Sequence, residues 1–289
     1  ARRVVTSCDG PFRSRLLFSG LDSSVAGEIE ARLASQGHAV VSNARNHRMA
    51  ADVPLLVPEI NPDHLDALSL QRKRTGGGYV VTNPNCSVVG LAMALAPLER
   101  SFGLASVHVV TLQALSGAGY PGVASMDIAD NVIPYIGGGE EEKIESEPRK
   151  ILGRFRDGRF EAAPFPVSAS VHRVDVSDGH TMAVFVRLGR DATPEEAMDA
   201  LARFRGEPQE RRLPSAPERP IHLLREPDRP QPRLDRDREG GMAVSVGRVR
   251  RDGERGLKLE ALVHNTVRGA AGAAILNAEL LHARGLLPA

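Results

Sequence analysis

The sequence contains few of the residues that mark several common classes of protein. It has no tryptophan, 4% aromatic residues in all, and only two cysteines, Cys8 and Cys86. Because there is no CxxC spacing and no Cys/His ligand pattern, a disulfide scaffold and a structural zinc site are excluded, and no bound metal is expected. This cysteine usage is typical of a reducing compartment, so the expected location is the cytoplasm.

Charge of one sign and long apolar runs are lacking as well. The chain has 37 Lys and Arg residues against 36 Asp and Glu residues, so no overall field attracts nucleic acid or an anionic membrane. The longest apolar run, residues 88–98, is too short to span a bilayer and contains Gly90 and Pro97. We therefore expect neither a nucleic-acid partner nor a membrane partner.

The apolar residues that are present suffice for two cores, since 42% of the 289 residues are hydrophobic. In residues 16–82, strand-like runs separated by a helix-like segment predict a βαβ unit and a parallel sheet. Residues 87–264 predict a second, α+β domain inserted before the last helix. Its strands are expected at 108–112, 167–176, 180–188, 242–249 and 257–263, and its helices at 140–152 and 193–204; the last helix is expected at 268–286.

Two segments of this second domain have distinctive compositions. Ser177-Asp178-Gly179 lies between two predicted strands and is typical of a β-hairpin turn. Residues 205–241 are dense in proline and charge, and composition alone favours a disordered linker there.

Cys86 lies between an apolar run, Tyr79–Val81, and the helix-like run that follows it. A thiol on the first turn of a helix faces unpaired amides, which favour the thiolate and lower the thiol pKa. The alternative is a small apolar side chain in the core, the commoner role of a lone cysteine. The nucleophile is favoured by polar and turn-forming neighbours: Asn83, Pro84, Asn85 and Ser87.

A cysteine nucleophile needs a group that handles protons, and histidine is the usual one near neutral pH. Of the nine histidines, His180 is the best placed, because it begins a strand and so projects from a rigid element. His172 and Arg173 point to opposite faces of their strand, and we expect Arg173 to face the site. The histidines expected in loops or on helix surfaces are His38, His47, His64 and His282.

An anionic substrate also needs fixed cations, for which Arg48, Lys150 and Arg173 are candidates; the alternative for each is a solvated surface charge. Glu147 and Lys150 are three residues apart on one predicted helix, a spacing that often indicates only a surface ion pair. The glycine-rich segment 116–122 can approach a phosphate or a ring closely.

Together these motifs resemble the aspartate-β-semialdehyde dehydrogenase family, most closely its archaeal and fungal branch. The resemblance covers essentially the whole chain, including residues 229–236, and so overturns the interpretation of a linker. It is carried by Asn83-Pro84-Asn85-Cys86-Ser87, Ser116-Gly117-Ala118-Gly119-Tyr120-Pro121-Gly122, the helix from Glu140 to Lys150, Arg173 to His180, and His264-Asn265-Thr266-Val267-Arg268-Gly269-Ala270-Ala271-Gly272.

Spacings agree with the resemblance. The family has a substrate-contacting glutamine 27 positions after its catalytic cysteine, and Gln113 stands there. Its substrate-gripping arginine precedes the catalytic histidine by seven positions, as Arg173 precedes His180. The family's Glu-x-x-Lys substrate pair falls on Glu147 and Lys150, and its phosphate-binding arginine on Arg48.

The resemblance implies a glyceraldehyde-3-phosphate-dehydrogenase-like fold of the α/β class, with an incomplete Rossmann-type parallel-sheet domain and an inserted α+β domain. The expected boundaries are residues 1–86 for the dinucleotide-binding part and 87–264 for the catalytic and dimerisation domain. Residues 265–289 form a helix returning to the first part. A homodimer or homotetramer is implied, and the apolar strands 167–176 and 242–249 predict an exposed sheet face for it.

The implied reaction is NADP-dependent reductive dephosphorylation of 4-phospho-L-aspartate to L-aspartate 4-semialdehyde, reversible through a cysteine thioester. It serves the biosynthesis of lysine, threonine, methionine and isoleucine. By the resemblance, Cys86 is the nucleophile, His180 handles the proton, and Asn85 and Gln113 position the substrate. The substrate-binding residues are Arg48, Glu147, Lys150 and Arg173, with phosphate at Arg48 and Lys150. The cofactor-binding residues are Ser116, Gly117, Ala118, Gly119 and Asn265.

One departure leaves alternatives open. The family's strand and Gly-x-x-Gly-x-x-Gly turn, which cradle the cofactor pyrophosphate, are not found before Ser19. Either the reading frame extends upstream by about 30 residues or more, or dinucleotide binding is lost; the chain as given is expected to bind dinucleotide poorly. The preference between NADP and NAD stays open. The alternatives are a related reductase, of malonyl-CoA or N-acetyl-glutamyl phosphate, and a non-catalytic dimerising subunit.

Overall fold

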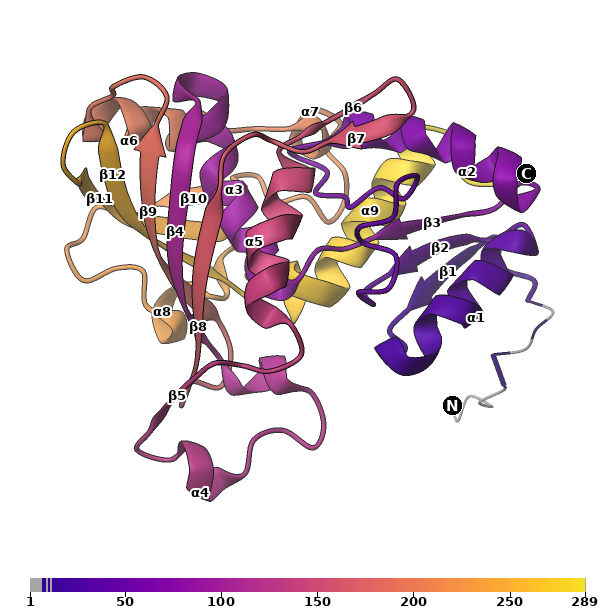
Figure 1. Cartoon of the computed structure of the whole chain (residues 1–289), viewed down its shortest axis with the longest axis horizontal. Helices are drawn as coiled ribbons and strands as arrows, with labels where there is room; N and C mark the ends of the chain where they lie inside the picture. Colours follow the sequence, from indigo (N-terminus) through magenta and orange to yellow (C-terminus); the bar gives the residue numbers. More distant parts are fainter. Residues whose placement is uncertain (1–6, 9, 11, 289) are drawn as a thin grey trace.

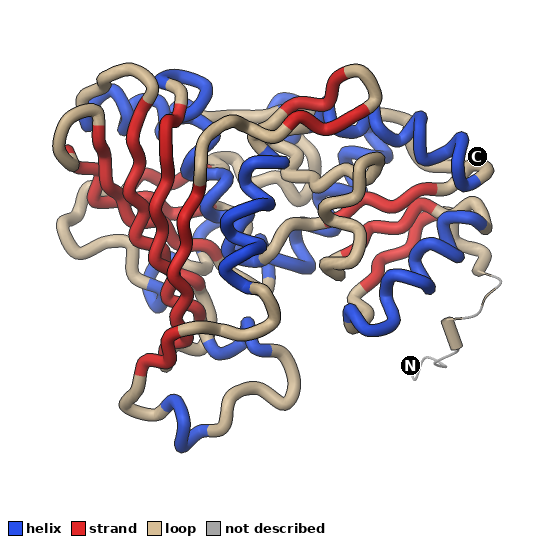
Figure 2. Tube along the Cα trace, in the orientation of Figure 1, coloured by secondary structure: helices blue, strands red, loops and turns tan. Residues whose placement is uncertain are grey.

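The computed structural model describes residues 7, 8, 10 and 12–288. Its strands form two main sheets, at opposite sides of Figure 1. The helices α3, α5 and α9 fill the space between them (Figure 2). Within the described ranges, no helix combines the length and the apolar character needed to cross a membrane. The arrangement confirms the predicted class, a parallel-sheet part joined to a larger α+β part.

The smaller sheet is parallel, as the sequence predicts, with the order β1-β2-β3. Its strands are β1 (Leu16–Ser19), β2 (Ala39–Ser42) and β3 (Tyr79–Thr82). Its helical elements are α1 (Ser23–Ser35), η1 (Pro62–Ala67) and α2 (Leu68–Thr75). Because parallel strands end at one edge of a sheet, the loops after β1, β2 and β3 lie together, and the last of them leads into Cys86.

The larger sheet is mixed, with the strand order β10-β11-β12-β9-β4-β8-β5. In chain order its strands are β4 (Leu104–Gln113), β5 (Val132–Pro134), β8 (Val167–Val174), β9 (His180–Leu188), β10 (Ile221–Leu223), β11 (Val244–Arg251) and β12 (Gly256–Val263). A separate antiparallel ribbon consists of β6 (Arg154–Arg156) and β7 (Arg159–Glu161).

Three helices pack against this sheet and one another: α3 (Cys86–Phe102), α5 (Glu140–Ile151) and α6 (Pro194–Arg203). The predicted final helix begins as a π-helix, η4 (Val267–Ala271), and continues as α9 (Gly272–Ala283). The short elements are η2 (Leu115–Ala118), α4 (Ser125–Ile128), α7 (Glu207–Glu210), α8 (Pro232–Asp235) and η3 (Arg238–Gly241).

Helix α3 is the central core element. The side chain of Asn85 caps it, accepting hydrogen bonds from the backbone N–H groups of Ser87 and Val88. Every residue from 87 to 98 is buried, and burial of each large aliphatic side chain is worth roughly 1.5–3 kcal/mol. The helix therefore holds its first residue, Cys86, in a fixed position relative to both sheets.

The predicted hairpin at residues 177–179 is wrong. Strands β8 and β9 follow one another in the chain, but β4 lies between them, parallel to β8 and antiparallel to β9. The sequence Ser177-Asp178-Gly179 indicates only that the chain reverses direction locally, whereas the pairing of strands depends on the whole sheet. This insertion places the ends of β4, β8 and β9 side by side.

Residues 205–241 are ordered. The family resemblance implied this order, whereas composition alone favoured a disordered linker. They contain α7, β10, α8 and η3. The buried carboxylate of Asp235 binds Arg229 and Arg238 together with the backbone N–H of Gln231, which explains how so polar a segment folds. This segment also packs against β11, since a Cβ at Gly247 would lie 2.4 Å from the carbonyl oxygen of Arg229.

The prediction of an exposed apolar face on residues 242–249 is therefore wrong. Met242, Val244 and Val246 are buried within the chain, each at most 8% exposed. In β8 the outward positions are polar and include Ser168 and Ser170. The open face of the sheet lies instead over β4 and β9, with Leu112 40% exposed.

Candidate active site

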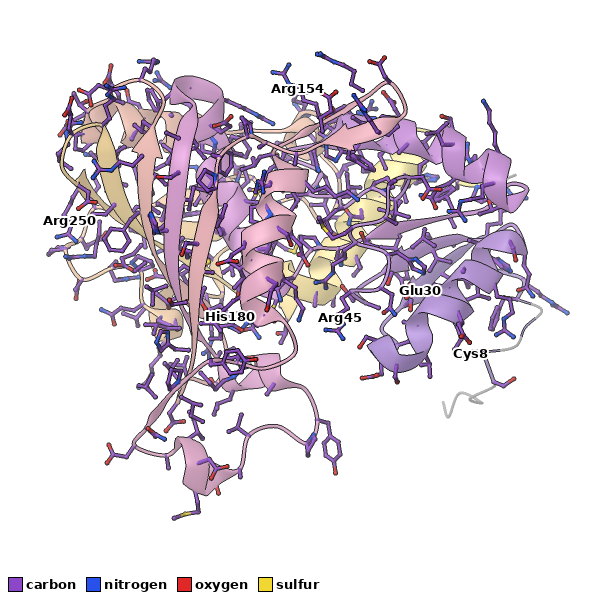
Figure 3. All side chains as sticks on the ribbon, viewed as in Figure 1. Cys8, Glu30, Arg45, Arg154, His180 and Arg250 are labelled. Atoms are coloured by element: carbon purple, nitrogen blue, oxygen red, sulfur yellow. The ribbon has the colours of Figure 1, made fainter. Side chains whose placement is uncertain are left out.

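A pocket of about 490 Å³ opens between the two sheets at the N-terminal ends of α3 and α5. Figure 3 shows His180 of the large sheet and Arg45 of the loop after β2 at this end of α5. The pocket brings together seven of the residues named from the sequence: Arg48, Asn85, Cys86, Gln113, Gly117, Ala118 and Arg173. It also contains several that were not named: Arg45, Tyr135, Glu140 and Lys143.

Cys86 and His180 are in direct contact. The Sγ atom of Cys86 lies 3.3 Å from Nε2 of His180, although the two residues come from α3 and the start of β9. Two glycines permit this approach. A Cβ at Gly117 would lie 2.8 Å from Cε1 of His180, and one at Gly269 would lie 2.8 Å from the Cβ of Cys86. Any larger residue at either position would displace the pair.

The ring of His180 is fixed by a backbone donor. The N–H of Ala114, directly after β4, donates to Nδ1 of His180 over 3.0 Å. The neutral ring therefore carries its proton on Nε2, toward Cys86. Burial, and then the positive charge of Arg173, lowers the pKa of His180 to about 3. His180 is consequently neutral at physiological pH.

The prediction of a lowered thiol pKa for Cys86 is wrong for this resting site. Burial raises the pKa of Cys86 to about 12, and the carboxylate of Glu140 adds to the rise, against the opposing charges of Arg48 and Arg173. The helix N-terminus does not compensate, because the amides of Ser87 and Val88 already bind the Asn85 side chain. The resting pair is a thiol beside a neutral imidazole.

Glu140, the first residue of α5, connects the polar groups of the pocket. Its Oε1 accepts hydrogen bonds from Nδ2 of Asn85 over 2.8 Å and from Nε2 of Gln113 over 3.1 Å. Its Oε2 accepts from Nζ of Lys143 over 3.1 Å. The sequence did not single it out, because Glu141 and Glu142 follow it directly and carry the same carboxylate. Only the rotation of α5 about its axis directs Glu140, rather than its neighbours, into the pocket.

Glu147 and Lys150 are both buried, so the surface ion pair considered from their spacing does not form. Glu147 accepts from Nη1 of Arg48 over 2.9 Å and from the backbone N–H of Asn85 over 2.7 Å. Lys150 donates its three protons to the carbonyl oxygens of Arg48, Ala50 and Val53, each over 2.8 Å. Burial lowers the pKa of Lys150 to about 8. Both side chains thus hold the Arg48 loop against α5.

Two arginines keep donors directed at the pocket. Arg173 is 5% exposed and uses Nη1 on the carbonyl oxygen of Ala114 over 2.6 Å. Arg48 uses Nη1 on Glu147 and Nη2 on the carbonyl oxygen of Asn43, while its buried Nε has no partner in the described structure. As expected, Arg173 faces the site, whereas His172 points to the other face of β8.

The glycine-rich segment 116–119 lies exposed at the pocket rim, beside His180 and Arg173. Asn265 ties this segment to the turn before β9. Its Nδ2 donates to Oγ of Ser116 over 2.8 Å and its Oδ1 accepts from the N–H of Gly179 over 2.9 Å. Ser116, Gly119 and Asn265 do not line the pocket itself.

His64 differs from the prediction of a solvated side chain. It is fully buried, its Nδ1 bonds to Asn61 over 3.0 Å, and its ring packs 4.9 Å from that of Phe160. It lies in η1, and the β6–β7 ribbon, distant in sequence, covers it. It is not part of the Cys86 pocket.

Comparison with known proteins identifies the family and the fold. A family model described as the semialdehyde dehydrogenase dimerisation domain matches residues 95–268, and the semialdehyde dehydrogenase NAD binding domain matches residues 11–68. The aspartate-semialdehyde dehydrogenase of Archaeoglobus fulgidus is 54% identical over 92% of this chain and 76% of that protein. The chain belongs to the aspartate-semialdehyde dehydrogenase family. The enzyme of Schizosaccharomyces pombe is 47% identical over 98% of this chain and 82% of its own.

Solved structures of the family agree. The structure of aspartate semialdehyde dehydrogenase with NADP from Candida albicans superposes with a TM-score of 0.89 at 43% identity, over 98% of this chain and 82% of that one. The Vibrio cholerae aspartate semialdehyde dehydrogenase II complexed with ASA gives 0.77 at 28% identity, over 93% and 80%. These relatives confirm the resemblance, the oxidoreductase class and the fold, and they do not favour the malonyl-CoA reductase-like or silent-subunit alternatives.

The residues present fit a dinucleotide. The small sheet presents the loops after three parallel strands at one edge, the arrangement that binds nucleotides in such sheets. The buried Oγ of Ser19, at the end of β1, has no partner among the described residues, so a polar donor or acceptor remains available at this edge. The exposed backbone of 116–119 faces the same opening across the pocket.

Proposed function

We propose that this protein interconverts 4-phospho-L-aspartate and L-aspartate 4-semialdehyde, with release or uptake of phosphate, through a thioester on Cys86. The observation that carries the proposal is the 3.3 Å contact between Cys86 and His180 at the bottom of a pocket lined by arginines. A thiol beside a proton-handling ring serves acyl transfer, and paired guanidinium groups bind carboxylate and phosphate.

Cys86 is the nucleophile and His180 the proton carrier. Since the resting pair is neutral, the thiolate forms as the sulfur attacks, and the positive charges of Arg48 and Arg173 stabilise it. Because Nε2 carries the proton of the resting ring, it can accept the thiol proton only after the ring proton has moved to Nδ1, where the N–H of Ala114 opposes it. The charged ring is therefore a short-lived carrier that returns its proton at once.

Asn85 and Gln113 position the acyl oxygen. Glu140 holds both amides, and Glu147 holds the backbone of Asn85, so neither side chain needs to reorganise during the reaction. Arg173 binds the carboxylate at the amino-acid end of the substrate, and Arg48 binds phosphate through its unpaired Nε. Glu147 and Lys150 act on the substrate through Arg48 and the loop that carries it.

The cofactor is NADP, which supplies or accepts the hydride when it is bound. The neighbour from Candida albicans, solved with NADP, supports this choice over NAD. Residues Ser116, Gly117, Ala118, Gly119 and Asn265 form the wall on the large-sheet side. The proposed division of the chain is a dinucleotide-binding part at 1–86, a catalytic and dimerisation domain at 87–264, and a returning helix at 265–289.

The protein is proposed to assemble as a homodimer or homotetramer through the larger domain. Two features support this beyond the dimerisation-domain match. In the described part of the chain, no helix layer covers β4 and β9 on the face of the large sheet opposite α3, and Phe185 and Leu112 lie there partly exposed. The segment with α4 and β5 projects from the body of the molecule, and Tyr120, Met126 and Val132 on it are each more than half exposed (Figure 1).

The test is an assay of NADP reduction with aspartate semialdehyde and phosphate, followed by the absorbance of NADPH. The proposal expects turnover that requires both substrates and is not supported when coenzyme A replaces phosphate. A readout independent of the cofactor is protection of Cys86 from iodoacetamide by aspartate semialdehyde. Turnover with coenzyme A but not phosphate, or no protection, would overturn the proposal.

A further inference from the structure

A buried ion pair joins two segments that are far apart in the sequence. Glu59 lies in the turn before η1, and Arg268 lies in the π-helix η4; both side chains are fully shielded from solvent. Nη2 of Arg268 donates to Oε2 of Glu59 over 2.6 Å and lies 3.8 Å from Sδ of Met93 in α3. Neither residue lines the Cys86 pocket, so the proposed function gives the pair no role.

The hydrogen bonding of this pair is incomplete. Nε and Nη1 of Arg268 and Oε1 of Glu59 are buried without a hydrogen-bond partner among the described residues. Removing two charges from water is costly, and a buried pair often adds less stability than apolar side chains of similar volume would. Stability alone therefore does not account for the pair. A fixed geometry is the other property that such a pair can supply.

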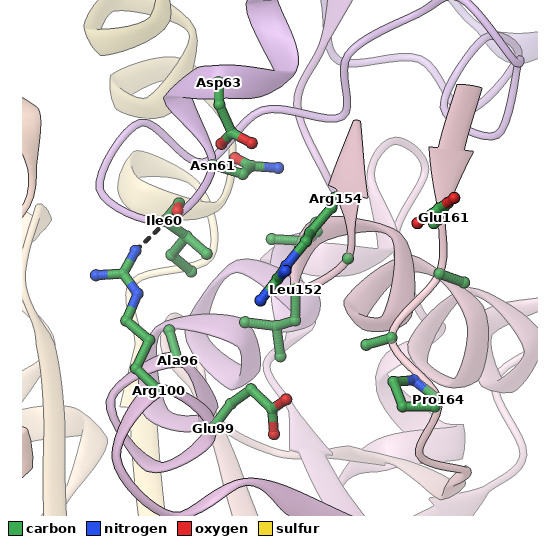
Figure 4. Close-up of a pocket in the computed structure, with 14 residues that line it drawn as sticks. Ile60, Asn61, Asp63, Ala96, Glu99, Arg100, Leu152, Arg154, Glu161 and Pro164 are labelled. Atoms are coloured by element: carbon green, nitrogen blue, oxygen red, sulfur yellow. Dashed lines mark hydrogen bonds between the residues drawn. The ribbon is translucent and has the colours of Figure 1, made fainter. Parts of the chain in front are cut away.

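Glu59 is itself held in place. Its turn is closed by Asn61, whose Oδ1 accepts from the N–H of Val57 and whose Nδ2 donates to the carbonyl oxygen of Leu55, each over 2.9 Å. Figure 4 shows Asn61 at the edge of a second pocket. In addition, a Cβ at Gly206 would lie 2.4 Å from Cα of Glu59, so residue 206 packs directly on this turn. Glu59 is therefore a fixed anchor.

The helix η4 forms a wall behind Cys86. A Cβ at Gly269 would lie 2.8 Å from the Cβ of Cys86, so η4 and the first turn of α3 are in direct contact. The carbonyl oxygen of Ala270 accepts from Nδ2 of Asn83, three residues before Cys86, over 3.0 Å. The two neighbours of Gly269 are thus both tied down, Arg268 by the ion pair and Ala270 by this hydrogen bond.

We infer that the Glu59–Arg268 pair positions the nucleophile. It fixes η4 against the first turn of α3, and so keeps Sγ of Cys86 in its 3.3 Å contact with Nε2 of His180. This inference rests on the proposed role of Cys86. A displacement of about 1 Å can lower a rate by about 10²-fold, so the pair should affect kcat. Since the pair does not line the pocket, KM should change little.

The test compares Arg268→Met with Arg268→Lys. Methionine fills much of the same volume without charge, whereas lysine keeps one charged donor, which suffices because Nη2 alone bonds to Glu59. We expect Arg268→Met to lower kcat by about 10- to 100-fold, with KM for aspartate semialdehyde within about twofold. Arg268→Lys should retain kcat within about threefold. Full activity of Arg268→Met, or equal losses in both variants, would overturn the inference.

The double change Glu59→Gln/Arg268→Met separates positioning from stability. It leaves no charge of the pair unpaired, so it should fold more readily than Arg268→Met and recover its melting temperature. Because the fixed contact is still missing, kcat should stay low. Recovery of kcat together with the melting temperature would show that the pair serves stability alone.

Leu201→Ala is the control for a general loss of stability. Leu201 is buried in α6, which lies beside the last turns of α3, at the end far from Cys86. Its truncation leaves a cavity and lowers the melting temperature. Assayed well below the melting temperature of every variant, Leu201→Ala should keep the kcat of the unmodified protein. The same loss of kcat in Leu201→Ala and Arg268→Met would contradict a positioning role.

Alkylation of Cys86 by iodoacetamide at pH 7 is a readout that needs no cofactor. A thiol released from its buried contact meets more solvent, so more of it ionises and it reacts faster. We expect Arg268→Met to speed alkylation at least about threefold, and Arg268→Lys and Leu201→Ala to leave it unchanged. An unchanged rate in Arg268→Met would overturn the inference. Absence of turnover in the unmodified protein would refute the proposed function instead, and alkylation would then decide the inference.

Discussion

The two ends of helices α3 and α5 have contrasting polar chemistry. At the N-terminal ends, Asn85, Gln113 and Glu140 are bonded to one another, and His180 is held by a backbone N–H. At the C-terminal ends, Arg154 and Asp63 are exposed, and the Oε2 atom of Glu99 has no hydrogen-bond partner in the described structure. The same two helices thus present a connected network at one end and mostly solvated charges at the other.

This difference bears on catalysis. A reacting site needs groups fixed before the substrate arrives, since reorganising them costs free energy in the transition state. Variants at the N-terminal ends should therefore change turnover, and variants at the C-terminal ends should not. The predictions below test this contrast.

The largest effect is expected from Cys86→Ser. A serine hydroxyl is hardly ionised even beside His180, and its ester is a poorer acyl donor than a thioester. Turnover should fall by a factor on the order of 10⁴ or more, with the melting temperature and assembly unchanged. Steady-state assay and light scattering check both statements. Substantial residual turnover would remove Cys86 from the mechanism.

His180→Asn should lower kcat by about 10²–10⁴ with little change in KM, because the ring acts mainly in the transition state. The amide can still accept from Ala114, so the fold around β4 should persist. A variant that raised KM and left kcat intact would show instead that His180 binds the substrate.

Arg173→Lys and Arg48→Lys should separate the two anion sites. Lysine keeps the charge but not the fork geometry. We expect Arg173→Lys to raise KM for aspartate semialdehyde by about tenfold, and Arg48→Lys to raise KM for phosphate by a similar factor. If both variants raised KM equally for both substrates, the proposed assignment of Arg173 to the carboxylate and Arg48 to phosphate would be refuted, although the family assignment would stand.

The smallest effect is expected from Glu99→Gln. Burial raises the pKa of Glu99, so its ionised form is less favourable in the folded than in the unfolded chain. The folded-state pKa exceeds the unfolded value, so this side chain favours folding only at acidic pH. The neutral amide should therefore raise the melting temperature slightly at pH 7 and leave turnover unchanged. A loss of turnover would show that the C-terminal ends of α3 and α5 also affect catalysis, and would contradict the contrast.

Much of the fold could be predicted from local patterns. The run of apolar residues at 88–98 and its polar neighbours predicted a buried helix beginning at Cys86, and α3 begins there. Thr193 and Pro194 predicted the start of α6, which has a capping box with Glu196. The hairpin at 177–179 failed because a turn sequence does not say whether another strand will enter between its arms.

Parts of the site could be predicted and parts could not. Cys86 and His180 were selected by residue type and position in their elements, and the family spacing added Gln113 and Arg173. Glu140 was not found, because its role depends on two amides from other elements. Lys150 was expected to face a phosphate, but its partners are three carbonyl oxygens of residues 48–53, almost a hundred residues earlier in the chain.

The sequence by itself determined the elements, the family and the choice of Cys86 as the candidate nucleophile, because these depend on periodicity, caps and spacing along one chain. Only the tertiary structure decided the protonation of Cys86 and His180 and the burial of His64. Those properties depend on what lies across each group in space. Desolvation and hydrogen bonding act over a few ångströms, and here the deciding neighbours are often 60 or more residues away in the chain, as Ala114 is from His180.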